Sequence, residues 1–408
     1  MALCARQESN LRPLAPAVGI RRALVDLVEP ETRQSIFPIA LCARQESNLR
    51  PLAPEASALS PELRARAGTS VAPVEFRAHK ATLRLAETFT ISRGSEDEAD
   101  VVQVEIVHNG ATGYGEAAPI ERYDESAASA LAWLEHVTLG DDPFALDEIF
   151  DTLPPGEQAA RAAVDAALYD LQGKLTGRPV YQLLGVRPVG PPTSWTIWLG
   201  DPDDMARRTE KIASRGFKRL KLKLGGFDGL DVERVKAVRS VTELPLMCDA
   251  NEAWTLDEAL EVIPQLDVEY CEQPLKAGDP DGPTLKERSP VPIYVDEDCH
   301  TLADVERCKQ RAHGINIKLA KSGGIREAVR MANAARALGL GVMLGCMVES
   351  GLGIAAGAHI ASLMDHVDLD GNLLLASDPW PGVEFVDGVQ RPSTRPGLGV
   401  EGHGVPGA

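Results

Sequence analysis

Five charged residues recur at nearly even intervals in the second half of the 408-residue chain, and their types could carry out acid–base and metal chemistry. They are separated by 26, 23, 24 and 22 residues, and each lies at the end of a short apolar run: Lys223, Asp249, Glu272, Asp296 and Lys318. A single carboxylate at a strand end is usually a solvated surface charge. Five residues in phase with a repeating element instead predict one site to which successive repeats contribute.

The three carboxylates are hard oxygen ligands of the kind that Mg²⁺ prefers, and the set lacks the His or Cys that zinc would favour. A divalent cation stabilises the enediolate that forms when a proton is removed next to a carboxylate. Lys223 and Lys318 could then act as bases on opposite faces of one planar carbon. Lys221 lies on the same strand face as Lys223 and supplies a nearby cation that favours the neutral form of that base. We also expect Lys221 to bind the substrate. These residues predict an epimerase that uses one Mg²⁺ per subunit.

Eight short apolar strands, separated by loops and amphipathic helices, can position these side chains. Their starts lie roughly 22 to 27 residues apart, which is the length of one βα unit. Even spacing without a glycine-rich first turn favours a modified (β/α) TIM-type barrel, and a doubly wound sheet is the alternative. The predicted strands are 194–199, 219–224, 244–250, 268–274, 292–297, 314–319, 341–347 and 366–370.

The chain before the barrel has a different pattern. Two alternating strands, 77–85 and 100–108, precede a hairpin turn at His108-Asn109-Gly110. Helices are expected at 126–137 and 156–175, and the second carries a face of small residues, Ala159, Ala163, Ala166 and Ala167, that permits close packing. We therefore expect an α+β capping domain at 71–190, the barrel at 191–371, and a C-terminal segment at 372–408 that returns to the cap.

The motifs together resemble the enolase superfamily, in its muconate-cycloisomerase-like branch, and within it the dipeptide epimerases. The resemblance covers roughly residues 74–400 and rests on LKLKLG, CDANEAW, YCEQP, VDEDCH, INIKLAKSGG and VDLDG. It implies that Lys223 and Lys318 are the acid/base pair, that the three carboxylates bind Mg²⁺, and that an α+β domain caps the barrel. It also implies a dipeptide substrate, with L-Ala-D/L-Glu of murein peptide metabolism as the nearest match.

Two features of the sequence bear on the substrate. Asp368 and Asp370 are two residues apart on a predicted strand, so both could face an ammonium, and the family's D-x-D motif binds the dipeptide α-amino group. Arg93, in the cap, matches an arginine that binds the glutamate side chain in Ala-Glu epimerases. The sequence departs from the family pattern at two positions. Glu96 stands where the enterobacterial enzyme has a basic residue, and Ala320, beside Lys318, stands where many members have an aspartate.

The first seventy residues differ from the rest of the chain. Residues 2–16 and 40–54 are identical in sequence, and the segment carries nine arginines against seven acidic residues in an otherwise acidic chain. Repeats that stack into a fold drift in sequence and number at least three, so this duplication is recent. We interpret residues 1–70 as a non-native or disordered extension that arose from a misplaced start, with a duplicated partner-binding arm as the alternative.

Composition excludes several classes of protein. Forty-two basic against sixty acidic residues give a net charge of −18, which disfavours nucleic acid and anionic membranes as partners. Seven cysteines without a C-x-x-C pair fit neither a disulfide framework nor a zinc knuckle, and they indicate a reducing cytoplasm. We expect a cytoplasmic enzyme that acts on a small molecule, and a homo-oligomer is one assembly that the sequence allows.

Two other functions fit part of this pattern. A cycloisomerase or a succinylbenzoate synthase-like lyase of the same superfamily would keep the lysines and the metal ligands. A non-catalytic barrel that serves as a binding protein would keep only the fold.

Overall fold

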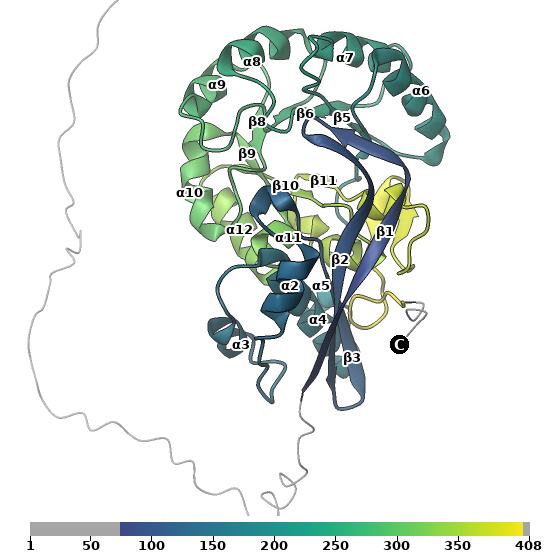
Figure 1. The fold of residues 1–408 in the computed structure, drawn as a ribbon, viewed down its shortest axis with the longest axis vertical. Coiled ribbons are helices and arrows are strands. Elements are labelled where there is room, and N and C mark those ends of the chain that lie inside the picture. The colour runs from purple at the N-terminus through teal and green to yellow at the C-terminus, as the bar shows by residue number, and fades with distance from the viewer. Residues whose placement is uncertain (1–73, 403–408) are drawn as a thin grey trace, which may run out of the picture. The chain divides into compact units, whose positions relative to one another are not determined.

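The computed structural model describes residues 74–402, so the predicted extension at 1–70 lies outside the described residues. Eight parallel strands form the larger domain, in the order β11-β10-β9-β8-β7-β6-β5-β4 (Figure 1). A parallel bridge between Thr193 and Val367 joins the two edges, and the Ser194 N–H donates to the Val367 carbonyl at 3.0 Å. The sheet is therefore almost closed into a barrel, as predicted. The strands are β4 Trp195–Ile197, β5 Leu220–Lys223, β6 Leu246–Asp249, β7 Cys271–Glu272, β8 Ile293–Val295, β9 Gly314–Lys318, β10 Gly341–Gly345 and β11 His366–Asp368.

Helices surround the barrel, and the amphipathic ones turn an apolar face toward the strands. In α12 the buried positions Ile325, Ala328, Met331, Ala332 and Ala335 recur every three or four residues, which is one helix face. The glycine-rich stretch at 351–358 forms a helix whose residues are all buried. The barrel helices are α6 Pro202–Ile212, α7 Asp231–Arg239, α8 Leu256–Val262, α9 Gly282–Arg288, α10 Leu302–Arg311, α11 Leu319–Ser322, α12 Ile325–Ala337 and α13 Gly351–Ala358.

The capping domain joins an antiparallel sheet to four helices. Asn109 and Gly110 both have positive φ, 48° and 78°, and close the predicted hairpin between β2 and β3. Ser126 caps the first predicted helix through a capping box. The elements are β1 Glu75–Ile91, β2 Gly94–His108, β3 Ala111–Ala117, the 3₁₀ turn η1 Glu121–Tyr123, α2 Ala127–Leu134, α3 Leu146–Thr152, α4 Gln158–Thr176 and α5 Val180–Leu183.

Helix α4 packs against β3 at very short range. A Cβ atom added at Gly115 would lie 1.9 Å from the Ala163 carbonyl oxygen, and one at Gly113 would lie 2.1 Å from that of Ala167. The predicted small-residue face of α4 therefore meets glycines on the strand. Bulkier residues on either side would force the helix and the sheet apart.

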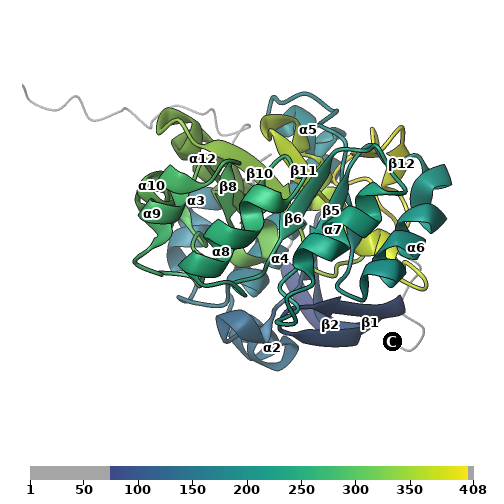
Figure 2. The ribbon, with the colours of Figure 1, turned by 90° about the horizontal axis from the view of Figure 1, so that it is seen from above.

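The cap and the barrel are held together by hydrogen bonds between buried groups. Glu116 on β3 accepts hydrogen bonds from the N–H and the hydroxyl of Ser350, which begins α13. After a short hairpin, β12 Glu384–Val386 with β13 Val389–Arg391, the chain passes the cap again. Gly397 exchanges backbone hydrogen bonds with the segment at 178–180. Figures 1 and 2 show strands β1 and β2 lying across one end of the barrel.

Within residues 74–402, no helix combines the length and apolar character needed to cross a membrane.

Candidate active site

The residues singled out at the strand ends meet at one mouth of the barrel. Asp249 and Glu272 are register partners on adjacent strands β6 and β7, so their side chains start side by side. Asp296 follows β8 directly, and Lys318 is the last residue of β9. All of these side chains are buried, which is unusual for charged groups and requires that they compensate one another.

Lys221 lies at the centre of this cluster, with 1% of its surface exposed. Its ammonium nitrogen contacts three carboxylates, at 3.2 Å from Asp249, 2.8 Å from Glu272 and 2.9 Å from Asp368. Burial opposes the charge of Lys221, but these carboxylates outweigh it and raise the pKa of the lysine well above its usual value. Carboxylates balance the charge of Lys221 in this structure. The expectation that Lys221 favours the neutral form of Lys223 therefore stays a prediction.

Lys223 faces the same side of β5 and shares an oxygen with Lys221. Its Nζ donates to Asp249 Oδ2 at 2.6 Å and to Asn251 Oδ1 at 3.1 Å. Asn251 also donates its backbone N–H to the other oxygen of Asp249 at 2.9 Å. One asparagine thus orients both the lysine and the carboxylate beside it.

Lys318 reaches the cluster from the opposite side of the barrel, four strands on from β5. Its Nζ lies 2.8 Å from Asp296 Oδ2. Burial opposes its charge, but Asp296 outweighs burial and raises the pKa of Lys318. Lys321, three residues later, contacts the other oxygen of Asp296, and the two lysines hold the pKa of Asp296 well below its usual range despite its burial.

The donor set suits a hard divalent cation. Glu272 Oε2 and Asp296 Oδ2 are buried oxygens that accept no hydrogen bond of acceptable geometry, although ammonium groups lie 2.8 Å away. Oxygens in that state are available as ligands. No three Asp, Glu, His or Cys side chains among residues 74–402 converge as a ready ligand set, because the lysines lie between the carboxylates. The residues fit Mg²⁺ by type and position, and holding it requires the ammonium groups to move aside.

The two aspartates of the VDLDG motif are buried at the same mouth but do not share a strand. Asp368 ends β11 and accepts hydrogen bonds from Lys221 and from the Ser194 hydroxyl. Asp370 lies beyond the strand, where the chain turns into η5 Gly371–Leu374, and it accepts the Thr196 N–H at 2.6 Å. The expectation that both lie on one strand is therefore wrong, because the 3₁₀ turn begins directly after Asp370. Burial and the charge of Asp368 raise the pKa of Asp370 to about 7.

Arg93 occupies the tip of the β1–β2 hairpin and reaches the loops that follow β6 and β8. Its Nη1 donates to Glu297 Oε1 at 2.9 Å, to the Asn251 carbonyl at 3.1 Å and to Glu252 Oε2 at 3.4 Å. Its Nε and Nη2 donate no hydrogen bond to any residue within 74–402. Glu96, the departure noted in the cap, is an exposed residue of β2.

Several residues around this mouth were not found from the sequence. Glu252, Glu297 and Lys321 follow predicted site residues by one to three positions, so their place in the motifs was the available signal. Arg122 lies in η1 of the cap, and nothing in its sequence context indicates that it makes a bidentate pair with Glu252, at 2.7 and 2.8 Å. Ala320, the second departure, is buried in α11 beside Lys318.

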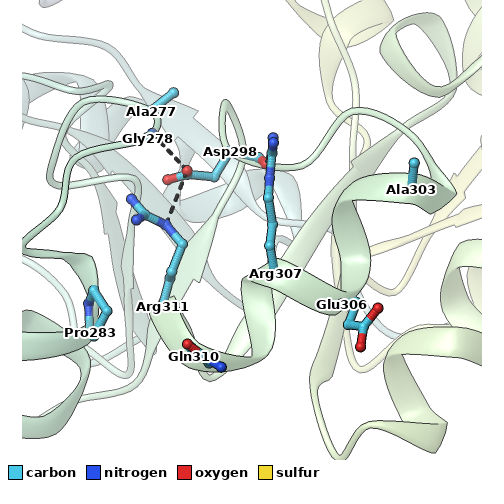
Figure 3. Close-up of a pocket in the computed structure, with 9 residues that line it drawn as sticks. All are labelled: Ala277, Gly278, Pro283, Asp298, Ala303, Glu306, Arg307, Gln310 and Arg311. Carbon is cyan, nitrogen blue, oxygen red and sulfur yellow. Dashed lines mark hydrogen bonds and ion pairs between the residues drawn. The ribbon is translucent and has the colours of Figure 1, made fainter.

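A separate hollow of about 810 Å³ lies between α9 and α10, and its lining includes none of the lysines and carboxylates described above. Figure 3 shows Asp298 inside it, paired with Arg311 and accepting the Gly278 N–H. Its lining contains no lysine, and its one buried carboxylate, Asp298, is paired with Arg311, so the chemistry of the strand-end cluster has no counterpart there.

Comparison with known proteins agrees with this geometry. Residues 74–185 match the model of the mandelate racemase / muconate lactonizing enzyme N-terminal domain, and residues 204–403 match that of the enolase C-terminal domain-like family. An L-Ala-D/L-Glu epimerase of Bacteroides thetaiotaomicron is 40% identical over 78% of this chain and 85% of its own length. A hydrophobic dipeptide epimerase of Roseobacter litoralis is 37% identical over 79% of this chain and 97% of its own.

Solved structures show the same relationship. The dipeptide epimerase of Enterococcus faecalis, complexed with Mg and L-Leu-L-Tyr, superposes with a TM-score of 0.77 at 32% identity, covering 81% of this chain and 99% of that one. A substrate-liganded L-Ala-D/L-Glu epimerase from Bacillus subtilis gives a TM-score of 0.77 at 31% identity, with coverage of 81% and 99%. The predicted fold and superfamily are confirmed. The chain belongs to the enolase superfamily, in its mandelate racemase / muconate lactonizing enzyme family.

Proposed function

We propose that this protein is a dipeptide epimerase that inverts the α-carbon of L-Ala-D/L-Glu. The observation that carries the proposal is the placement of Lys223 and Lys318 on β5 and β9, four strands apart around one mouth, with the three carboxylates between them. Two bases on opposite sides of a bound carbon can remove a proton from one face and return one to the other. The names of the relatives support the same reaction class.

In the proposed reaction, the Nζ of one lysine takes the α-proton of the substrate, and the electron pair moves into the adjacent carboxylate to give an enediolate. The other lysine donates a proton to the opposite face, which completes inversion. The two lysines exchange roles in the reverse direction. Asn251 keeps Lys223 oriented throughout, since it binds both the lysine and Asp249.

Asp249, Glu272 and Asp296 are proposed to hold one Mg²⁺, which supplies positive charge for the two enediolate oxygens. Three solved relatives of this fold are complexed with Mg. The buried, hydrogen-bond-free oxygens of Glu272 and Asp296 support this assignment.

The substrate's ends are assigned to separate residues. Asp368 and Asp370 are proposed to receive the α-ammonium group, since both carboxylates are buried at the mouth and a cation there would offset their charge. Arg93 is proposed to bind the glutamate side chain. Three acceptors fix its Nη1, and the remaining edge of the guanidinium is left for a carboxylate.

The test is incubation with Mg²⁺ and L-Ala-L-Glu in D₂O, followed by NMR and chiral analysis. Deuterium at the α-carbon together with inversion is the expected result. Ring closure or loss of a leaving group from other superfamily substrates, without epimerisation, would instead support a cycloisomerase or lyase. Inertness toward every substrate would support a non-catalytic barrel.

The role of Arg93 has its own test, in which L-Ala-L-Leu serves as the neutral control substrate. Arg93→Met should lower kcat/KM for L-Ala-L-Glu by a factor of ten or more, taking about 1.5–3 kcal/mol for a charged hydrogen bond, while largely sparing L-Ala-L-Leu. Equal losses with the two dipeptides would remove Arg93 from the specificity site and leave an epimerase of other dipeptides.

A further inference from the structure

The strained turn after β6 links the cap to the catalytic lysine. Asn251 and Glu252 both have positive φ, 45° and 69°, a conformation that non-glycine residues adopt only at an energetic cost. Contacts from the cap and from the barrel maintain this turn. Ser92 and Arg93 of the cap donate hydrogen bonds to the Asn251 carbonyl, and the Asn251 side chain accepts one from Lys223. A charge placed at this turn therefore lies close to the site where substrate binds.

The Glu252 carboxylate supplies a charge at this turn, and two arginines from different parts of the cap contact it. Arg122 forms a bidentate pair with Glu252 through Nε and Nη2, and Arg93 approaches the same carboxylate at 3.4 Å. The Ala277 N–H donates a further hydrogen bond at 2.9 Å. Burial opposes ionisation of Glu252, but the hydrogen bonds from Arg122 and Ala277 outweigh it and lower the pKa of the carboxyl. Glu252 is therefore an anion at neutral pH.

Two glutamates pair with the two arginines at the hairpin tip. Arg93 contacts Glu252 and Glu297, and Arg122 contacts Glu252. Burial raises the pKa of Glu297 to about 7, so Glu252 is the carboxylate that is fully ionised at neutral pH. Arg93 retains its two shorter contacts, to Glu297 and to the Asn251 carbonyl, without Glu252. The main effect of Glu252 on Arg93 is therefore electrostatic. The Glu252 carboxylate offsets the positive charge of Arg93, but the orientation of Arg93 does not depend on it.

We propose that Glu252 and Arg122 form a specificity-determining pair that sets the electrostatic potential around Arg93 and so the preference between acidic and neutral dipeptides. This inference rests on the proposed epimerase function. Neither residue needs to touch the substrate. Removing the Glu252 carboxylate makes the potential next to Arg93 more positive, and removing the Arg122 charge makes it more negative.

The two substitutions must therefore act in opposite directions. Glu252→Gln should raise the ratio of kcat/KM for L-Ala-L-Glu to that for L-Ala-L-Leu, and Arg122→Gln should lower it. We expect changes of about two- to five-fold, the range for partly exposed ion pairs. Both shifts should shrink at high ionic strength, because Arg122 is partly open to solvent.

Two controls separate this role from a structural one. Arg122→Lys keeps the charge and should leave the ratio close to that of the unmodified protein, although the bidentate geometry is lost. Arg207→Gln removes an arginine in an ion pair on the outer helix α6 and should leave the ratio unchanged. If Glu252→Gln does not fold, the direction of the Arg122→Gln effect decides, because that side chain is more exposed.

If the kcat/KM ratio shifts in the same direction in both variants, or in neither, the inference is wrong. The proposed epimerase function still stands in that case, provided that the unmodified protein exchanges the α-proton for deuterium. Absence of exchange with both dipeptides in the unmodified protein would overturn the proposed function, and this inference with it. Opposite shifts of the kcat/KM ratio in the two variants, each smaller at high salt, would establish that Glu252 and Arg122 set the specificity electrostatically.

Discussion

Replacing Lys221 by Met would test how the buried charges of the site are balanced. Methionine keeps most of the side-chain length and removes the charge, so three carboxylates lose a partner at 2.8 to 3.2 Å. Removing one partner of a buried ion pair costs about 3–5 kcal/mol, because the remaining charge stays buried. Lys223 and Lys318 still contact Asp249 and Asp296, so we expect a value within that range rather than a multiple of it.

The assay is urea-induced unfolding in the presence of a chelator, with and without added Mg²⁺. Lys211→Met is the matched control, since Lys211 pairs with Glu87 at 3.2 Å on the surface and should contribute about 1 kcal/mol or less. Mg²⁺ at a hundred times its Kd adds about 2.7 kcal/mol to the free energy of unfolding of any form that binds it. Because Lys221 competes with the cation for Asp249 and Glu272, we expect this stabilisation to begin at a lower Mg²⁺ concentration for Lys221→Met. A loss no larger than that of the control would refute the charge-balance reasoning.

Three further predictions concern stability and the chain ends. Gly115→Ala should lower the free energy of unfolding by about 1–3 kcal/mol, because its Cβ would meet the Ala163 carbonyl, whereas Gly140→Ala, with open space around it, should have little effect on the melting temperature. Burial raises the pKa of Glu116 from 4.5 to about 7, so the folded state holds this proton to higher pH than the unfolded state. Stability therefore falls as pH rises from about 4.5 to about 7, by ~3 kcal/mol from this group, and Glu116→Gln should flatten that part of the unfolding profile. An unchanged slope would show that Glu116 does not titrate there. Deleting residues 1–70 should leave turnover and melting temperature unchanged, and a loss of either would contradict the misplaced-start interpretation.

The barrel and its strand-end charges could be predicted because they follow from periodicity along the chain. Each predicted strand is present, although β7 spans only Cys271–Glu272 where seven residues were expected. The chain curves into its loop early, and Gln273 already has a positive φ of 35°. Such loop geometry depends on contacts made from other elements, and the local residue pattern does not encode it.

The same limit applies to the partners of the site residues. Lys221 was recognised as a cation near Lys223, but its three carboxylate contacts arise only when β5, β6, β7 and β11 close into one barrel. The pairing of Arg122 with Glu252 joins residues 130 positions apart, across the boundary between cap and barrel. No spacing rule connects them, so only the three-dimensional structure shows the pair.

The central claim is that two lysines act on opposite faces of one carbon, and Lys223→Ala and Lys318→Ala test it most directly. Each variant is incubated with each epimer of the dipeptide and Mg²⁺ in D₂O, and inversion and α-deuterium incorporation are measured separately. We predict that neither variant inverts the carbon, and that any remaining exchange is confined to one epimer, a different one for each variant. Inversion at the full rate in either variant would contradict the two-base account.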